Sequence, residues 1–337
     1  MFLSFYGLRE QPFGVTPDPR FLYLSPTHRE ALASVFYGID AGRGFTAVIA
    51  KPGMGKTTLL FQLLQKLKPS ARTAFLFQTQ CDSREFMKFL LRELGCELQP
   101  QQDLVSMHEE FNRCLLQEAH AGRQFVLVID EAQNLEPSVL ETVRLLSDFE
   151  TPRAKLLQIV LAGQPELADK LARPSLRQLR QRISMLTTIA PLPAEEVDRY
   201  VRHRLTAAGR REPLFTAAAT KAIAEVSEGI PRNISNICFN ALSLGCSLKA
   251  WIIDEAIIRQ VVADADLTGL RSDPGLVNFR PESISLADAM AGARSIEVKQ
   301  NLVAVPSRSE EALSSKEALA YMQEIVQRLK SNQNFTN

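Results

Sequence analysis

The chain has 337 residues and is almost neutral, because its 39 Lys and Arg residues are balanced by 38 Asp and Glu residues. This balance excludes a polybasic nucleic-acid-binding tail and an acidic disordered protein as the main design. Apolar residues make up 45% of the chain, which is enough for substantial hydrophobic cores, and the length predicts about two domains.

Neither a membrane helix nor a secreted protein is indicated. The longest segment without a charged residue, Asn233 to Leu248, has 16 residues, whereas a membrane-spanning helix needs about 20 mostly apolar ones. The N-terminus lacks the basic start and the continuous apolar core of a signal peptide. We therefore expect a cytoplasmic protein with no direct membrane insertion.

The cysteines form an odd set in which no two residues have the C-x-x-C spacing. They are Cys81, Cys96, Cys114, Cys238 and Cys246. Disulfide frameworks and zinc sites usually show even numbers or close pairs. We therefore expect neither, and we interpret these cysteines as small apolar packing residues in a reducing compartment.

The first predicted segment, residues 1–44, is an N-terminal lead-in followed by a helix. The lead-in is rich in proline, which is typical of extended chain. Ser25 and Pro26 then give a helix start signal, an N-cap followed by proline at the first helical position, and Gly42 marks the helix end.

Residues 45–192 alternate short apolar runs with helical patterns, which is typical of an α/β fold. The apolar runs are residues 45–50, 73–77, 125–129, 156–162 and 183–189. Continuous apolar strands are usually buried on both faces, so we expect a five-stranded parallel sheet covered by helices.

From residue 193 the strand signal stops. Helical patterns follow at residues 194–208, 216–228, 231–248 and 254–263. They predict a small all-helical lid domain over residues 193–266.

Residues 267–337 are rich in Ser, Pro, Asp and Gly, so we expect a mostly disordered linker. Within it, Leu319, Met322, Val326 and Leu329 have helical spacing. This spacing predicts either a terminal helix that binds a partner or a helix that folds back on its own chain or forms only transiently.

The strongest functional signal lies where the first predicted strand runs into a helix, which we expect to begin at Leu59. The pattern is that of a P-loop, G-x-x-x-x-G-K-[ST], except that Ala50 replaces the first glycine and leaves the loop geometry open. The residues expected to contact ATP are Ala50, Lys51, Pro52, Gly53, Met54, Gly55, Lys56, Thr57 and Thr58. Glycines let backbone N–H groups turn toward phosphates. We expect Lys56 to reach the β- and γ-phosphates and the Thr57 hydroxyl to bind Mg²⁺.

The second signal is the pair Asp130 and Glu131, which directly follows the apolar run 125–129. Open α/β sheets place their ligands at such strand ends. We expect Asp130 to hold Mg²⁺ and Glu131 to polarise the attacking water, so that the chain hydrolyses ATP. The pair is a weak signal alone and a strong one after a P-loop.

Together the two motifs resemble the AAA+ superfamily of ATPases, and this resemblance implies three further site residues. Gln164 resembles the polar sensor beside the γ-phosphate, unless it is a plain turn residue. Arg182 resembles the arginine finger that acts on a neighbouring subunit. We prefer it to Arg180 because it directly precedes the last strand. The alternative is that these arginines lie on a solvated basic helix face. Arg232 resembles the lid-domain arginine that reaches the γ-phosphate, unless it is exposed on an ordinary turn. The resemblance implies an ATP-promoted homo-oligomer, expected to be a ring.

The lead-in carries a closer resemblance. Phe5-Tyr6-Gly7-Leu8, Pro17-Asp-Pro-Arg20 and His28-Arg-Glu-Ala-Leu are similar to the opening of general secretion pathway protein A. That bacterial family has AAA+ ATPases associated with type II secretion, pilus assembly and exopolysaccharide export. The resemblance covers residues 1–265.

This resemblance implies a role in membrane-system assembly with a membrane-assembly protein partner. It also implies that Tyr23 lines the adenine pocket, although core packing is equally compatible with the sequence. The family usually has Gly-Glu where this chain has Ala50 and Lys51. Its secretion-type members continue into a membrane helix and a peptidoglycan-binding domain, whereas this chain continues into the polar segment 267–337.

The alternative is a DNA-associated ATPase similar to transposition regulators. Two basic clusters favour it: Arg173, Arg177, Arg180 and Arg182, then Arg199, Arg202, His203, Arg204, Arg210 and Arg211. Such clusters also occur on solvated helix faces and subunit contacts, and no base-stacking aromatic residues are interleaved with them. A third reading, a nucleotide-binding scaffold without turnover, is disfavoured because the expected catalytic residues are all present.

Overall fold

A computed structural model describes residues 2–77, 80–96, 102–151 and 154–267. All of these residues lie in one unit of the chain, Met1–Arg280. The predicted linker beyond residue 267, with its candidate terminal helix, lies outside the described residues. Among the described helices, none is long and apolar enough to cross a membrane.

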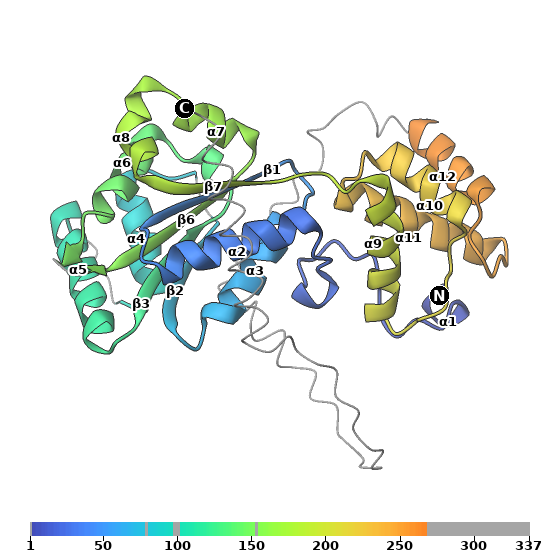
Figure 1. Ribbon diagram of the computed structural model, residues 1–337, viewed down its shortest axis with the longest axis horizontal. Helices are drawn as coiled ribbons and strands as arrows, with labels where there is room; N and C mark the ends of the chain where they lie inside the picture. The colour runs from blue at the N-terminus through green and yellow to red at the C-terminus, as the bar shows by residue number, and fades with distance from the viewer. Residues whose placement is uncertain (1, 78–79, 97–101, 152–153, 268–337) are drawn as a thin grey trace, which may run out of the picture. The chain divides into compact units, whose positions relative to one another are not determined.

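The unit Met1–Arg280 contains a five-stranded parallel sheet with the order β2-β3-β6-β1-β7 (Figure 1). The strands are β1 (Phe45–Ala50), β2 (Ala71–Leu76), β3 (Gln124–Ile129), β6 (Leu157–Gly163) and β7 (Ile183–Ile189). Each of the five apolar runs of the sequence therefore overlaps a strand to within a few residues at the ends, and the predicted α/β fold is confirmed. Short strands β4 (Glu150–Thr151) and β5 (Ala154–Lys155) form a separate antiparallel pair.

Helices cover both faces of the sheet, which explains why β1 and β6 are buried along their whole length. On one face, α2 (Pro26–Asp40) packs on β1 and β7, and α3 (Lys56–Leu67) packs on β2 (Figure 1). The other face carries α4 (Ser83–Glu93), α5 (Leu104–His120), α6 (Pro137–Leu146), α7 (Pro165–Leu171) and α8 (Arg177–Arg182). The single-turn 3₁₀ helices are η1 (Pro19–Phe21), η2 (Ala132–Asn134) and η3 (Pro174–Leu176).

The starts of two helices can be compared with the starts expected from the sequence. The start of α2 is confirmed, because the Ser25 hydroxyl accepts a hydrogen bond from the His28 N–H and Pro26 is the first helical residue. The expected start of α3 at Leu59 is wrong, because the helix already begins at Lys56. Gly55 adopts the left-handed conformation with φ +82° and turns the chain directly into the helix.

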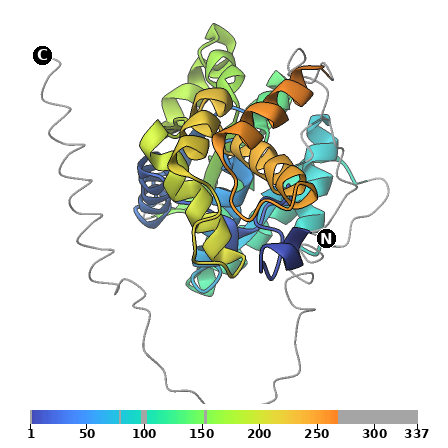
Figure 2. The same ribbon diagram turned by 90° about the vertical axis from the view of Figure 1, so that its right-hand side faces the viewer.

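The remaining helices are α9 (Ala194–Ala207), α10 (Ala217–Ser227), α11 (Pro231–Ser247) and α12 (Glu255–Leu267). They pack around a second hydrophobic core, and the predicted helical segments at residues 194–263 are confirmed. The N-terminal lead-in joins this core: α1 (Phe2–Phe5) contacts α11 (Figure 2), and Tyr6 and Phe13 are buried among the helices. The predicted division into segments 1–44, 45–192, 193–266 and 267–337 stays a prediction.

Gly229 lies in the turn between α10 and α11 and contacts the segment that follows β7. Its carbonyl accepts a hydrogen bond of 2.9 Å from the Leu192 N–H. A Cβ at Gly229 would lie 2.1 Å from the Leu192 carbonyl oxygen, and the glycine has φ +68°. Both the conformation and the close backbone approach therefore require glycine at this position.

We predict that Gly229→Ala destabilises the protein far more than Gly42→Ala. Gly42 also has a positive φ, +63°, but a Cβ there would meet no atom within 4 Å. Gly42→Ala should cost about 1 kcal/mol from backbone strain, and Gly229→Ala at least about 2 kcal/mol more because backbone atoms must move. Urea unfolding followed by circular dichroism measures both. Equal losses would show that the turn relaxes freely around the added methyl group.

Candidate functional site

The P-loop connects the end of β1 to the start of α3. Positive φ angles occur at Gly53, +80°, and Gly55, +82°. Gly55 is the second glycine of the pattern, whereas Gly53 occupies one of its variable positions. Ala50 is the last residue of β1, where it pairs with Ile189 of β7. Because this position has strand geometry, it does not require glycine, and Ala50 is compatible with the loop.

Lys56 is the buried cation of the site, with only 6% of its surface exposed. Its Nζ lies 2.8 Å from Glu131 Oε1 and 3.2 Å from Asp130 Oδ1. Burial alone would lower the pKa of Lys56, but the two carboxylates outweigh it and raise that pKa above its ordinary value. Lys56 is therefore charged at neutral pH, and it balances the charge of the carboxylates that follow β3.

Thr57 and Asp130 are brought together as the sequence predicted for a metal site. The Thr57 hydroxyl donates a hydrogen bond of 2.5 Å to Asp130 Oδ2, and Asp130 is buried. Hydroxyl and carboxylate oxygens are ligands that suit Mg²⁺. The donor set therefore fits a magnesium ion held by few protein ligands.

Glu131 stands at the centre of a polar network. Its Oε2 accepts hydrogen bonds from Gln133 Nε2 at 2.5 Å and from Gln164 Nε2 at 3.0 Å. Burial raises the pKa of Glu131, but Lys56 and these amide donors lower it more, so the pKa lies below its usual range. The residue also has a positive φ of 51°, a strained conformation of the kind found at functional sites.

Gln133 is a site residue that the sequence analysis missed. Besides donating to Glu131, its Oε1 accepts a hydrogen bond of 3.1 Å from the Gln164 N–H. It therefore joins the residues that follow β3 and β6. Its only sequence signal is a polar side chain two positions after Glu131.

His28 is the second residue that the sequence analysis missed. Its Nε2 lies 2.8 Å from the Met54 carbonyl oxygen in the P-loop, and its Nδ1 lies 2.7 Å from the Ser25 hydroxyl. Burial lowers the pKa of His28, so the ring is neutral at pH 7. Since a carbonyl only accepts, Nε2–H donates to Met54 and Nδ1 accepts from Ser25.

The structure places Arg232 at the start of α11 against the P-loop. Its backbone N–H donates a hydrogen bond of 3.1 Å to the Gly53 carbonyl, and a Cβ at Gly53 would lie 2.8 Å from the Arg232 Cβ. The side chain of Arg232 is exposed. Arg232 thus lies next to the P-loop, and the expectation that its side chain reaches the γ-phosphate stays a prediction.

Tyr23 lies beside a small pocket next to the P-loop. The lining residues are Thr16, Asp18, Phe21, Leu22, Tyr23, His28, Met54, Gly55, Thr58, Tyr200, Arg204 and Pro231. The Tyr23 hydroxyl donates to Glu196, and burial raises the pKa of Tyr23 to about 12, with Glu196 adding to the shift. The pocket combines aromatic side chains, P-loop residues and the start of α11. The expected contact of Tyr23 with adenine stays a prediction.

Arg182 is not part of this cluster. Its guanidinium forms an ion pair with Asp148 and donates a hydrogen bond of 2.6 Å to the Ser147 hydroxyl, both just after α6. Arg180, the other finger candidate, is exposed. Both arginines precede β7, whose start pairs with the start of β1, whereas Lys56 follows the end of β1. The finger role of Arg182 stays a prediction.

Solved structures share this fold at low sequence identity. The Aeropyrum pernix ORC2 protein, in ADPNP–ADP complexes, has a TM-score of 0.60 and 14% identity, covering 76% of this chain and 72% of that one. Cdc6p from Pyrobaculum aerophilum has a TM-score of 0.59 and 17% identity, covering 75% and 70%. These similarities support the P-loop fold alone.

The sequence comparisons agree with the motifs. An uncharacterized HTH-type transcriptional regulator of Methanocaldococcus jannaschii is 29% identical over 41% of this chain and 34% of its own length. General secretion pathway protein A of Aeromonas hydrophila is 41% identical over 242 residues, which cover 72% of this chain but only 44% of that relative. Residues 39–171 match the AAA domain family. The chain thus carries an AAA domain with a P-loop fold, and its resemblance to general secretion pathway protein A is confirmed.

Proposed function

We propose that this chain binds ATP and hydrolyses it with the help of Mg²⁺. The observation that carries the proposal is the buried cluster of Lys56, Asp130 and Glu131 at the P-loop, with Gln164 on the same carboxylate. Phosphoryl transfer needs positioned charges more than covalent chemistry, and these residues supply them. The ADPNP–ADP complexes of the similarly folded Aeropyrum pernix protein support a nucleotide at this kind of fold.

The residues divide the work between binding and hydrolysis. Backbone N–H groups from Gly53 to Thr58 and the Lys56 ammonium bind the phosphates. The Thr57 hydroxyl and the Asp130 carboxylate hold Mg²⁺, which neutralises charge on the transferred phosphoryl group. Glu131 orients the attacking water.

Lys56 and Glu131 bind each other in this structure, so nucleotide binding must redistribute their contacts. When Lys56 turns to the phosphates, Glu131 loses its contact at Oε1. Gln133 and Gln164 still donate to Oε2 and keep the carboxylate in place. Glu131 then presents a free oxygen to water, and Gln164 remains bound to the same carboxylate. We therefore assign Gln164 the sensor role.

The proposal includes a homo-oligomer. Arg182 is the finger that stabilises transition-state charge in a neighbouring subunit. Its ion pair with Asp148 would hold it in a fixed place until a neighbour binds. Arg232, next to Gly53, acts within its own subunit on the γ-phosphate.

We propose that the ATP cycle serves assembly of a secretion, pilus or exopolysaccharide-export system through a membrane-assembly protein partner. The support is the 41% identity to general secretion pathway protein A. The chain spans less than half of that relative. The proposed role therefore rests only on the part that the two chains share. We also propose that the segment with Leu319, Met322, Val326 and Leu329 contributes to docking.

DNA association is the second candidate function, favoured by the relative described as an HTH-type transcriptional regulator. The basic clusters support it less than their sequence suggests. Five of their arginines already bind partners in the chain: Arg182 binds Asp148, Arg199 binds Glu196, Arg202 binds Asp198, Arg204 donates to the Pro12 carbonyl, and Arg210 donates to the Tyr6 carbonyl. Arg204 and Arg210 tie the lead-in to the helices through these backbone contacts. The ion pairs of Arg182, Arg199 and Arg202 are partly exposed, and each arginine can exchange its partner for a phosphate.

We predict that two substitutions separate binding from hydrolysis. Lys56→Ala should lose nucleotide binding, whereas Glu131→Gln should bind ATP but hydrolyse it about 10²- to 10⁴-fold more slowly, because only the orientation of water is lost. Lys66→Ala, an exposed lysine in the last turn of α3, is the matched control and should keep both properties. Equilibrium ATP binding and phosphate release measure the two steps. Hydrolysis by Glu131→Gln at the parental rate would disprove its assignment.

We predict that hydrolysis per subunit rises with protein concentration in the presence of ATP. Arg182→Ala subunits should inhibit mixed assemblies beyond simple dilution, since each removes a finger from its neighbour. Arg180→Ala is the control on the same helix and should not inhibit. A constant rate per subunit from nanomolar to micromolar protein contradicts the oligomer, and inhibition by Arg180→Ala alone moves the finger to that residue.

We predict no submicromolar binding of duplex DNA, with or without ATP. Fluorescence anisotropy at low and moderate salt measures it, with Glu131→Gln used to hold the ATP state. Binding through phosphates would weaken steeply with salt, with a log–log slope of roughly −0.9 for each neutralised phosphate. The opposite outcome is ATP-dependent, salt-sensitive binding that is lost when the exposed Arg173, Arg177 and Arg180 are changed to alanine. That outcome would make DNA association, and not export assembly, the better-supported function.

A further inference from the structure

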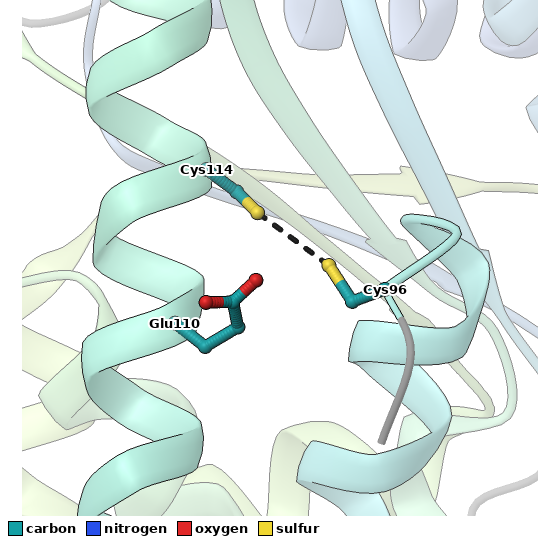
Figure 3. A group of neighbouring side chains, drawn as sticks. All are labelled: Cys96, Glu110 and Cys114. Atoms are coloured by element: carbon teal, nitrogen blue, oxygen red, sulfur yellow. Dashed lines mark hydrogen bonds between the residues drawn. The ribbon is translucent and has the colours of Figure 1, made fainter. Parts of the chain in front are cut away.

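Cys96, Glu110 and Cys114 converge between the end of α4 and the middle of α5 (Figure 3). The end of α4 lies near the start of β2, where Arg72 donates a hydrogen bond to the Leu94 carbonyl, whereas the candidate nucleotide site lies where the strands end. The two sulfur atoms lie 3.5 Å apart. One ligand atom from each of the three residues lies within 4.8 Å of the other two, and all three residues are half-buried. The cysteines were expected to be plain packing residues, and their separation in sequence gave no sign of this cluster.

The backbone fixes these side chains in place. Gly95, with φ +74°, ends α4 in a left-handed turn, and the Cys96 N–H donates a hydrogen bond of 3.0 Å to the Leu91 carbonyl. Glu110 and Cys114 are four residues apart on α5 and therefore share one face of that helix. The cluster thus joins two well-defined elements, both packed on the main hydrophobic core.

The donor set suits a soft divalent cation. Thiolates select zinc over magnesium and calcium, and a carboxylate is an accepted third ligand. Two sulfurs at about 2.3 Å from one tetrahedral zinc ion lie about 3.8 Å apart, close to the 3.5 Å observed. A disulfide would require the sulfurs to approach to about 2.05 Å, so the observed spacing matches the metal better.

Arg113 supplies the outer contact that such a site needs. Its Nε donates to Glu110 Oε2 at 3.0 Å and its Nη2 donates to Oε1 at 2.5 Å. Each carboxylate oxygen keeps a further lone pair for a metal. Ligating carboxylates are commonly hydrogen-bonded in this way, which fixes their orientation.

We propose that Cys96, Cys114 and Glu110 bind one Zn²⁺ ion, with the fourth position open to water. Binding converts the two thiols to thiolates and releases their two protons, without any change of oxidation state. The ion fastens the end of α4 to α5. It is distinct from the Mg²⁺ expected at Thr57 and Asp130, whose donors are all oxygen.

Titration of the reduced full-length protein with Co²⁺ and then Zn²⁺ tests the site. One equivalent of Co²⁺ should give the thiolate charge-transfer and visible bands of a tetrahedral complex, and Zn²⁺ should abolish them. Cys96→Ser with Cys114→Ser should lose the bands, while Cys246→Ser, a half-buried cysteine on α11, should keep them. Glu110→Gln should weaken Zn²⁺ binding at least about tenfold, unlike Glu109→Gln on the exposed side of the same helix.

Thermal unfolding gives an independent measurement. Zn²⁺ should raise the melting temperature of the parent and of Cys246→Ser but not that of the double serine variant. The absence of a thiolate band in the reduced parent, or equal Zn²⁺ affinity in the double variant, overturns the proposal. Recovery of a Cys96 to Cys114 disulfide even when Zn²⁺ is present also overturns it.

Discussion

The burial of the Lys56 ammonium among carboxylates is the constraint on which the site depends. A buried charge is tolerated only when it is paired, and here Asp130 and Glu131 supply the partners. They follow β3, whereas Lys56 follows β1, and β6 lies between these two strands in the sheet. The strand order therefore decides that Gln164, which follows β6, joins the same cluster.

Much of this arrangement follows from the sequence because the signals are local. Buried parallel strands appear as continuous apolar runs, and a P-loop needs glycines at fixed offsets, so β1, β3 and the loop could be predicted. Contacts between distant segments could not, because nothing in their spacing reveals them. The Gln133 amide on Glu131, the His28 ring on Met54 and the convergence of Cys96 with Cys114 all depend on strand order and helix packing.

The replacement of the first P-loop glycine shows how structure resolves a sequence ambiguity. A motif position is occupied by glycine either for conformational freedom or for lack of space, and the sequence does not distinguish the two. Ala50 continues the pairing of β1 with β7, so neither reason for a glycine applies at this position. At Gly53 both reasons apply, because the residue has a positive φ and an added Cβ would collide with Arg232. Substitutions in this loop therefore differ in consequence according to backbone geometry.

The P-loop is held from two directions by parts of the chain outside the sheet. The neutral His28 ring on α2 donates to the Met54 carbonyl, and the Arg232 N–H at the start of α11 donates to the Gly53 carbonyl. Three residues before Arg232, the Gly229 carbonyl holds the Leu192 N–H beyond β7. A loop that rearranges around phosphates must alter hydrogen bonds to both α2 and α11. The P-loop is thereby linked to the helical part through a backbone contact, independently of the Arg232 side chain.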